Sequence, residues 1–128
     1  MKVRIMAHIY PSEEEKKVVE AVKNVFPTIE IKTNDDVIEG ESKDLRSLEK
    51  LKNKLGLQAI RDSARREIKK RMSDDSMEFS LNKQAATVDK VSFSYGEAPL
   101  GEIDVKIEAD NPNEILNYLA PNKKKREG

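Results

Sequence analysis

Residues 42–72 read SKDLRSLEKLKNKLGLQAIRDSARREIKKRM, and the rest of the 128-residue chain is organised around this stretch. It holds eleven Lys or Arg against four Asp or Glu, although the whole chain carries 24 of each kind and no net charge. Leucines recur at helical spacing on one side and cations on the other, which predicts an amphipathic helix that breaks or bends near Gly56. Positive charge gathered in one segment of a neutral chain indicates an anionic partner, RNA above all.

Placing the residues at about 100° per step separates an apolar stripe from a cationic side in both halves of the stretch. Ser42 is expected to be the N-cap of the first half. The two stripes expected to face a core are Leu45, Leu48, Leu51 and Leu55, followed by Leu57, Ile60, Ala64, Ile68 and Met72. The cationic side of the second half is the predicted RNA-binding surface and comprises Arg61, Arg65, Arg66, Lys69 and Lys70.

A second interpretation of the same helix is that its charges are simply solvated. Lys and Arg are good helix formers. The pairs Asp62–Arg66 and Glu67–Arg71 have the i,i+4 spacing of ordinary side-chain ion pairs, each worth a few tenths of a kcal/mol. From the helix alone, a binding face and a solvated face both stay open.

The composition excludes several kinds of chemistry. Cysteine is absent, which removes disulfides, thiolate metal sites and thiol nucleophiles. His8 is the single histidine, so a histidine-based metal site or catalytic triad would depend on it alone. We therefore expect a protein that is not an enzyme and has no metal or cofactor. With neither a signal-peptide pattern nor an apolar run of about 18 residues, we expect a cytoplasmic location and no membrane partner.

The pattern outside the basic stretch predicts one α+β domain over residues 1–121 and a basic, disordered tail over 122–128. The order is strand, helix, two strands, two helices, three strands and helix, which gives a mostly antiparallel sheet with helices on one face. Ser12 with Glu15 is expected to form a capping box for the first helix. The last three strands are expected to contain Met77–Leu81, Val91–Tyr95 and Ile103–Ala109. The uncovered sheet face is expected to carry Arg4, His8 and Tyr10, with Ser92 and Lys106 as further candidates.

The run FSLNKQAATVDKVSF at 79–93, preceded by QAIRDSARREI and followed by PLGEIDVKI, resembles a family of small uncharacterised archaeal proteins. The opening VRIMAHIYPSEEEKKVVEAVKNVFP and the closing ILNYLAP fit the same family, so the similarity covers nearly the whole chain. Its members are described as predicted RNA-binding proteins, are grouped with the archaeal exosome, and share the fold of ribosomal protein L five. The resemblance thus implies that fold, RNA as the ligand, and protein partners in RNA processing.

Two segments carry the match: the residues Gln58, Ile60, Arg61, Asp62, Ala64 and Arg65, and the run Leu81–Ala86. Neither is a known catalytic signature. In the second segment, Asn82, Lys83 and Gln84 follow a strand and could offer a cation and two amides to RNA. Asn82 and Gln84 could equally pin a buried turn, so Lys83 is the residue that joins the predicted RNA-binding set. Thr87 stands where the family pattern has a bulky apolar residue.

An alternative function is a protein-interaction or homodimerisation module. In this interpretation the basic helix docks on an acidic surface, for which the strand Glu102–Asp110 of a second copy is a candidate. Opposite patches on one neutral chain favour self-association. The sequence leaves this alternative open beside RNA binding.

Overall fold

Five antiparallel strands form one sheet in the order β2-β3-β1-β5-β4. The computed structural model describes residues 1–94 and 101–122 of the chain. The first strand in the chain, β1, is the central strand of the sheet and pairs with β3 on one side and with the last strand, β5, on the other. The strands are β1 (Lys2–His8), β2 (Glu30–Asn34), β3 (Val37–Ser42), β4 (Ser76–Asn82) and β5 (Glu102–Glu108).

Strict alternation gives the sheet one buried and one open face. In β1 the side chains of Val3, Ile5 and Ala7 are buried, whereas those of Arg4 and His8 on the other side are exposed. β5 repeats the pattern, because alternate residues of a strand point to opposite faces, and β4 departs from it at Ser80, which is buried. We call the uncovered side the open face; its exposed positions include Arg4, His8 and Lys106, as the alternation predicts.

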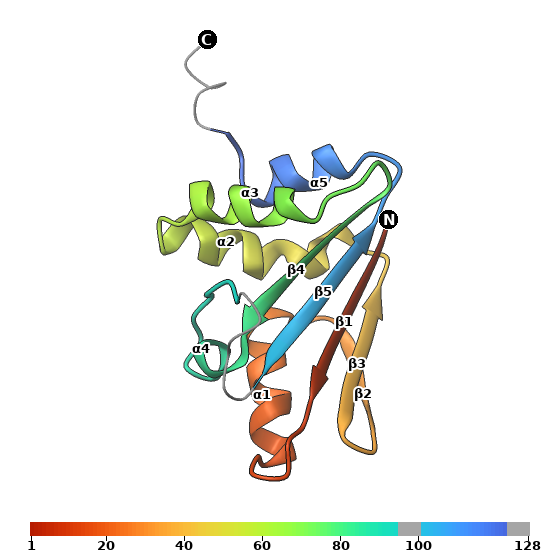
Figure 1. Ribbon diagram of the computed structural model, residues 1–128, viewed down its shortest axis with the longest axis vertical. Coiled ribbons are helices and arrows are strands. Elements are labelled where there is room, and N and C mark those ends of the chain that lie inside the picture. The colour runs from red at the N-terminus through yellow and green to blue at the C-terminus, as the bar shows by residue number, and fades with distance from the viewer. Residues whose placement is uncertain (95–100, 123–128) are drawn as a thin grey trace.

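All the described helices that form the core lie on the other side of the sheet. Figure 1 shows α2, α3 and α5 together at one end of the strands, and α1 with the short α4 toward the other end. No helix in the described part of the chain has the length and apolar character needed to cross a membrane. The helices are α1 (Glu15–Val25), the 3-10 helix η1 (Leu45–Leu48), α2 (Glu49–Leu57), α3 (Arg61–Lys70), α4 (Lys83–Thr87) and α5 (Pro112–Leu119). The predicted α+β class, with helices on one face of an antiparallel sheet, is confirmed.

The two predicted apolar stripes of the basic stretch are only partly correct. Leu48, Leu51 and Leu55 are fully buried, and each contributes roughly 1.5–3 kcal/mol of transfer free energy. Leu57, predicted to be in the core, is 86% exposed. The reason is that α2 runs through Gly56 and ends at Leu57, and Ala59 then adopts a left-handed conformation with φ of 57°. The helical phase starts afresh in α3, which leaves Leu57 outside both stripes.

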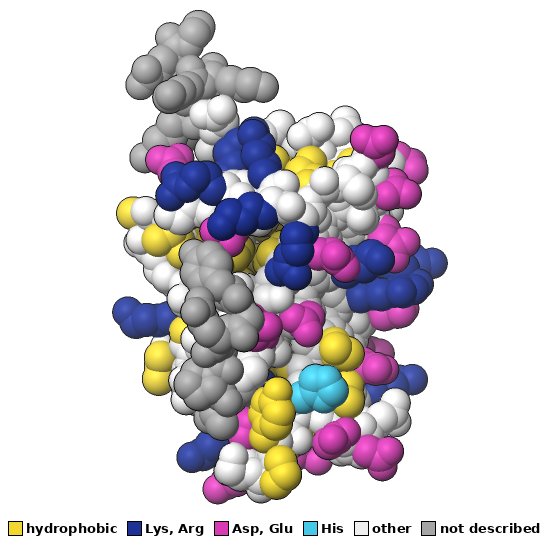
Figure 2. All heavy atoms as spheres, in the orientation of Figure 1, with side chains coloured by type: hydrophobic (Ala, Val, Ile, Leu, Met, Phe, Trp, Pro, Cys, Tyr) yellow, Lys and Arg dark blue, Asp and Glu magenta, His cyan; other side chains and the backbone are white. Residues whose placement is uncertain are grey.

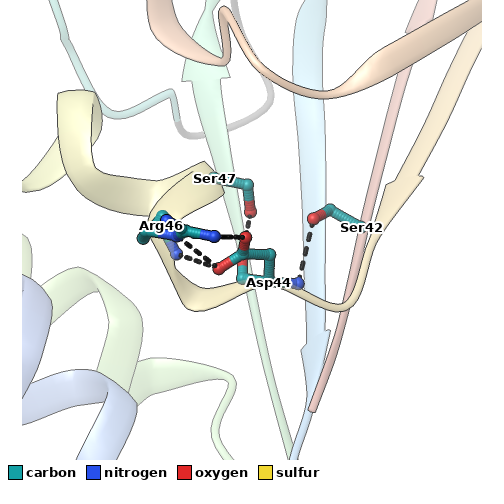
Figure 3. A network of polar contacts seen from close by, with 4 residues as sticks. All are labelled: Ser42, Asp44, Arg46 and Ser47. Carbon is teal, nitrogen blue, oxygen red and sulfur yellow. Dashed lines mark hydrogen bonds and ion pairs between the residues drawn. The ribbon is translucent and has the colours of Figure 1, made fainter.

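Asp44, and not the predicted Ser42, caps the helical stretch. Its carboxylate accepts a hydrogen bond from the backbone N–H of Arg46 at 2.9 Å and is held by the guanidinium of the same residue (Figure 3). Ser42 instead accepts from the N–H of Asp44 through its Oγ at 3.1 Å. The hydrogen bonds from Arg46 lower the pKa of the Asp44 carboxyl. This local network occupies the first arginine of the basic stretch.

The predicted capping box at Ser12 and Glu15 is wrong as well. Helix α1 begins at Glu15, with Glu14 as its N-cap residue and no side-chain cap. The neighbouring Glu13 points elsewhere, into a buried ion pair described below. The acidic residue in the first turn still suits the positive end of the helix dipole.

The strand predicted at Val91–Tyr95 does not form as such among the described residues. The family segment after β4 is helix α4, with Asn82 as its N-cap: the Asn82 carboxamide accepts from the N–H of Ala85 at 3.0 Å. Only Phe93 then pairs with the sheet, through a single bridge to Leu81. Tyr95 lies outside the described residues, as do residues 123–128 of the tail predicted to be disordered over 122–128.

Asp89 ties the end of α4 to helix α2. It follows α4 in a left-handed conformation with φ of 62°, which Asp and Asn tolerate better than most residues. Its carboxylate lies 2.8 Å from the Lys54 ammonium and 3.5 Å from that of Lys50. Hydrogen bonding to Lys54 lowers the pKa of Asp89 below its usual value of 3.8, and Lys50 adds to the effect.

We predict that Asp89→Asn changes the acid dependence of stability. A carboxyl whose pKa is lower in the folded state stabilises the protein above pH 3.8, and this contribution disappears as the pH falls through the folded-state pKa. The melting temperature of the wild type should therefore exceed that of Asp89→Asn at neutral pH. The difference should close as the pH falls below about 3.8, which is measurable by thermal denaturation at several pH values. A gap that stays constant down to pH 2 would contradict the assignment.

Candidate nucleic-acid interface

Helix α3 carries the residues that the sequence predicts to bind RNA, and it is amphipathic in the structure. Ala64 and Ile68 are fully buried on its inner side. Figure 2 shows Lys and Arg side chains gathered over α3 at one end of the open face. A basic residue pair also ends the helix, where positive charge suits the helix dipole. The predicted cations nevertheless divide into two groups with different surroundings.

Arg61 and Arg65 are half-buried, and their guanidinium groups contact other segments of the protein. The Arg65 guanidinium donates to the Asn117 side chain at 2.8 Å and to the Ala120 carbonyl at 2.9 Å. It thereby satisfies a carbonyl at the end of α5, which would otherwise lack a helical partner. The Arg61 guanidinium packs against Gly56, where a methyl group would collide with it. The Nε atoms of both arginines are buried.

The other cations of α3 face solvent. Among the described residues, neither Arg66 nor Lys69 makes an ion pair; Arg66 reaches only the Ser63 hydroxyl at 3.3 Å. Lys70 forms an ion pair with Glu67 at 2.8 Å. We call Arg66, Lys69, Lys70 and the next residue, Arg71, the basic ridge.

The i,i+4 pairs expected from a purely solvated helix do not form. Arg66 turns to Ser63 rather than to Asp62, and Glu67 pairs with Lys70 rather than with Arg71. The ridge therefore keeps positive charge that the neighbouring carboxylates do not cancel.

The cations of η1 and α2, in contrast, are already engaged within the protein. Arg46 is bound by Asp44, and both Lys50 and Lys54 are bound by Asp89. Lys52 lies over the ring of Tyr118, with its ammonium 5.5 Å from the ring centroid. The positive surface of the basic stretch is thus concentrated on the ridge of α3.

Arg71 belongs to the ridge, although it was not in the predicted site. It follows the last residue of α3, and its guanidinium donates to the Ser80 hydroxyl of β4 at 3.3 Å. Its carbonyl accepts from the N–H of Glu78. Because Arg71 lies just beyond the helix, helical periodicity does not predict its direction; the only signal is its place at the end of a run of cations.

Lys83, predicted to contact RNA, is instead 2% exposed. Its ammonium donates to the His8 carbonyl and to the Glu13 carboxylate, the latter at 3.0 Å. It also lies 4.9 Å from the centroid of the Tyr10 ring. The burial and these partners leave the ammonium no surface to offer a ligand. Lys83 thus joins α4 to the segment between β1 and α1.

We predict that Lys83→Met destabilises the protein by about 3–5 kcal/mol, because it leaves the buried Glu13 carboxylate without its cation. The double variant Lys83→Met with Glu13→Gln should recover part of that loss, since no buried charge then remains. Urea denaturation of the wild type, both single variants and the double variant measures this coupling. Additive losses in the double variant would show that the pair does not act as a unit.

The open face next to the ridge is hollowed into a groove of about 830 Å³. Arg71 from the ridge forms part of its wall, and Ser80 on β4 and Asp104 on β5 lie beside it. Across the strands, carboxylates outnumber cations among its lining side chains: Glu30, Glu39, Glu41, Glu78 and Asp104 against Arg4, Lys32, Arg71 and Lys106. Within the described residues, no group of three or more carboxylate or histidine side chains could hold a metal ion.

The fold and the ridge define a small α+β protein with a cationic helix at the margin of an open sheet face. A family model described as RNA binding matches residues 2–109. The UPF0201 protein of Methanothermobacter thermautotrophicus is 40% identical over 121 residues, which cover 94% of this chain and 91% of the relative. The chain belongs to the UPF0201 family of archaeal proteins.

Solved structures of the family have the same fold. The crystal structure of an uncharacterized UPF0201 protein gives a TM-score of 0.86 at 32% identity, covering 97% of this chain and 96% of that one. The UPF0201 protein from Methanococcus jannaschii gives 0.81 at 35% identity, covering 96% and 95%. The resemblance to an archaeal RNA-binding family that the sequence shows is therefore confirmed.

Proposed function

We propose that this protein is a non-catalytic RNA-binding protein that holds the phosphate backbone of structured RNA on the basic ridge. The observation that carries the proposal is the exposure of Arg66 and Lys69 on a helix whose charges the described carboxylates only partly cancel. The family model described as RNA binding supports the same ligand. A protein that binds at a patch in this way needs no net positive charge.

The ridge contacts phosphates rather than bases. Its members are exposed cations in the second half of α3 and just beyond it, and such side chains position a backbone without reading sequence. With three or four phosphates neutralised, the logarithm of the binding constant should fall with the logarithm of salt concentration at a slope of about −3. From 50 to 200 mM salt, affinity should then drop roughly 60-fold.

We predict that Arg66→Glu with Lys69→Glu weakens binding to a structured RNA hairpin more than tenfold and flattens the salt slope by about two. The two side chains are exposed, so the variant should melt like the wild type. Filter binding between 50 and 200 mM salt measures both effects. Arg65 is unsuited to this test because its loss would also remove the hydrogen bond that it donates to Ala120 at the end of α5.

The matched control is Lys16→Glu with Lys17→Glu, which makes the same change of charge in the first turn of α1, where acidic residues suit the helix dipole. It should bind RNA nearly as well as the wild type. Equal losses in both double variants would show that only net charge matters. Undetectable binding by the wild type at 50 mM salt would exclude the function itself.

A homodimerisation module is the second candidate, and the five carboxylates that line the groove of the open face favour it. The ridge of one copy could dock on the carboxylates of another, so the contact would be electrostatic and sensitive to salt. Sedimentation at two protein concentrations separates the candidates. A dimer that buries the ridge and survives physiological salt would support self-association, whereas a monomer leaves the ridge open for RNA.

The proposal fits a cytoplasmic protein of RNA metabolism. Association with RNA processing or with the exosome is implied by the family resemblance alone and stays a prediction. Purification of the protein from an archaeal lysate, with sequencing of the bound RNA and mass spectrometry of bound proteins, is the direct measurement of both kinds of partner.

A further inference from the structure

The groove on the open face holds charges that are not paired within the part of the chain that the structure describes. Glu78 on β4 and Lys106 on β5 stand opposite each other in the sheet register, yet neither makes an ion pair with any residue in the described ranges. The neighbouring pair in register is Ser80 and Asp104, whose side chains share a hydrogen bond of 2.8 Å. Two carboxylates therefore lie at diagonal positions, which in antiparallel sheets are about 7–8 Å apart.

A hydrogen-bonded path joins this groove to the basic ridge. The Arg71 guanidinium donates to the Ser80 hydroxyl, and that hydroxyl donates to the Asp104 carboxylate. The backbone of Arg71 also accepts from the N–H of Glu78. A ligand bound to the ridge at Arg71 is thus already at the entrance of the groove.

The charge of the two surfaces decides which part of an RNA each can take. Phosphates are attracted to the ridge, whereas the groove, with five lining carboxylates against four cations, offers them no net attraction. A base carries no net charge and can enter. Because an ionised carboxylate only accepts hydrogen bonds, it favours a base edge that presents N–H donors.

Among the four bases, guanine presents the best edge to a carboxylate. Its N1–H and 2-amino group are adjacent donors that one carboxylate can bind with both oxygens. Uracil has a single N3–H between two carbonyl oxygens, which a carboxylate repels. Single-stranded loops make such Watson–Crick edges available to proteins.

We infer that the groove on the open face binds the base of a loop nucleotide whose phosphate lies on the basic ridge, and that Glu78 and Asp104 make it prefer guanine. This inference rests on the proposed RNA-binding function and adds base selection to it. Glu78, which makes no ion pair with a described residue, makes the bidentate contact. Asp104, held by Ser80, is the second acceptor of the pocket, and Arg71 supports both sites.

The test uses two RNA hairpins with one stem sequence and loops of uridine, one of which has a single guanosine at its centre. The wild type should bind the guanosine hairpin roughly tenfold more tightly, as expected for one good bidentate base contact. Glu78→Gln with Asp104→Asn should bring the ratio close to one. Its affinity for the uridine hairpin should stay equal or rise slightly, because a repulsive charge is removed.

The control is Glu20→Gln, which removes a carboxylate from the exposed side of α1 and should preserve the tenfold preference. A loop with 6-thioguanosine at the same position provides a second readout. Under ultraviolet light it should cross-link to peptides of β4 or β5, as identified by mass spectrometry.

Three results would overturn the inference. Equal wild-type affinity for the two hairpins, together with a loss on Arg66→Glu with Lys69→Glu, would refute base selection and leave the ridge function intact. An unchanged guanosine preference in the groove variant would place selection elsewhere. The third result is a wild-type dimer that RNA does not dissociate and in which hydrogen exchange shows the groove residues to be protected. It would assign the groove to a second copy of the chain.

Discussion

The corner between α2 and α3 is the constraint on which the placement of the basic ridge depends. Ala59 is held in a left-handed conformation, and the preceding Gln58 makes two side-chain hydrogen bonds to Val91, one to the carbonyl at 2.8 Å and one from the N–H at 2.9 Å. The amide of Gln58 thus pairs with the backbone as a strand would. These hydrogen bonds fix the corner against the segment that follows α4. The helical phase of α3 therefore starts anew after the corner.

The sheet provides the second level of organisation. Because its helices cover one face only, alternate residues of β1 and β5 are apolar and buried, and the others are free to carry function. The open face uses this freedom for charge: Arg4 pairs with Glu41 and Glu108 on either side, while Glu78 and Lys106 stay without ion pairs among the described residues. Arg71 connects that face to α3, so ridge and groove form one continuous surface.

Cations of the same type have opposite roles in this protein, and burial separates them. Taking a charge out of water is costly unless partners compensate for it, and Lys83 and Arg65 each donate to two acceptors of the protein. Arg66 and Lys69 keep their hydration and remain available for exchange with phosphates. A charge that the protein has already satisfied stabilises the fold, whereas a charge left to solvent can bind a ligand.

The sequence alone determined the fold class, the buried faces of the strands and the concentration of positive charge between residues 42 and 72, since periodicity and composition are local properties. It also indicated the family through the run from Phe79 to Phe93. Only the tertiary structure decided which cations are free. Arg65 contacts Asn117 of α5, which is 52 residues further along the chain, and Lys83 contacts Glu13, which is 70 residues away. A local sequence pattern cannot predict contacts over such separations. Leu57 was misplaced for a local reason: a single left-handed residue at Ala59 resets the helical phase that the prediction extended across it.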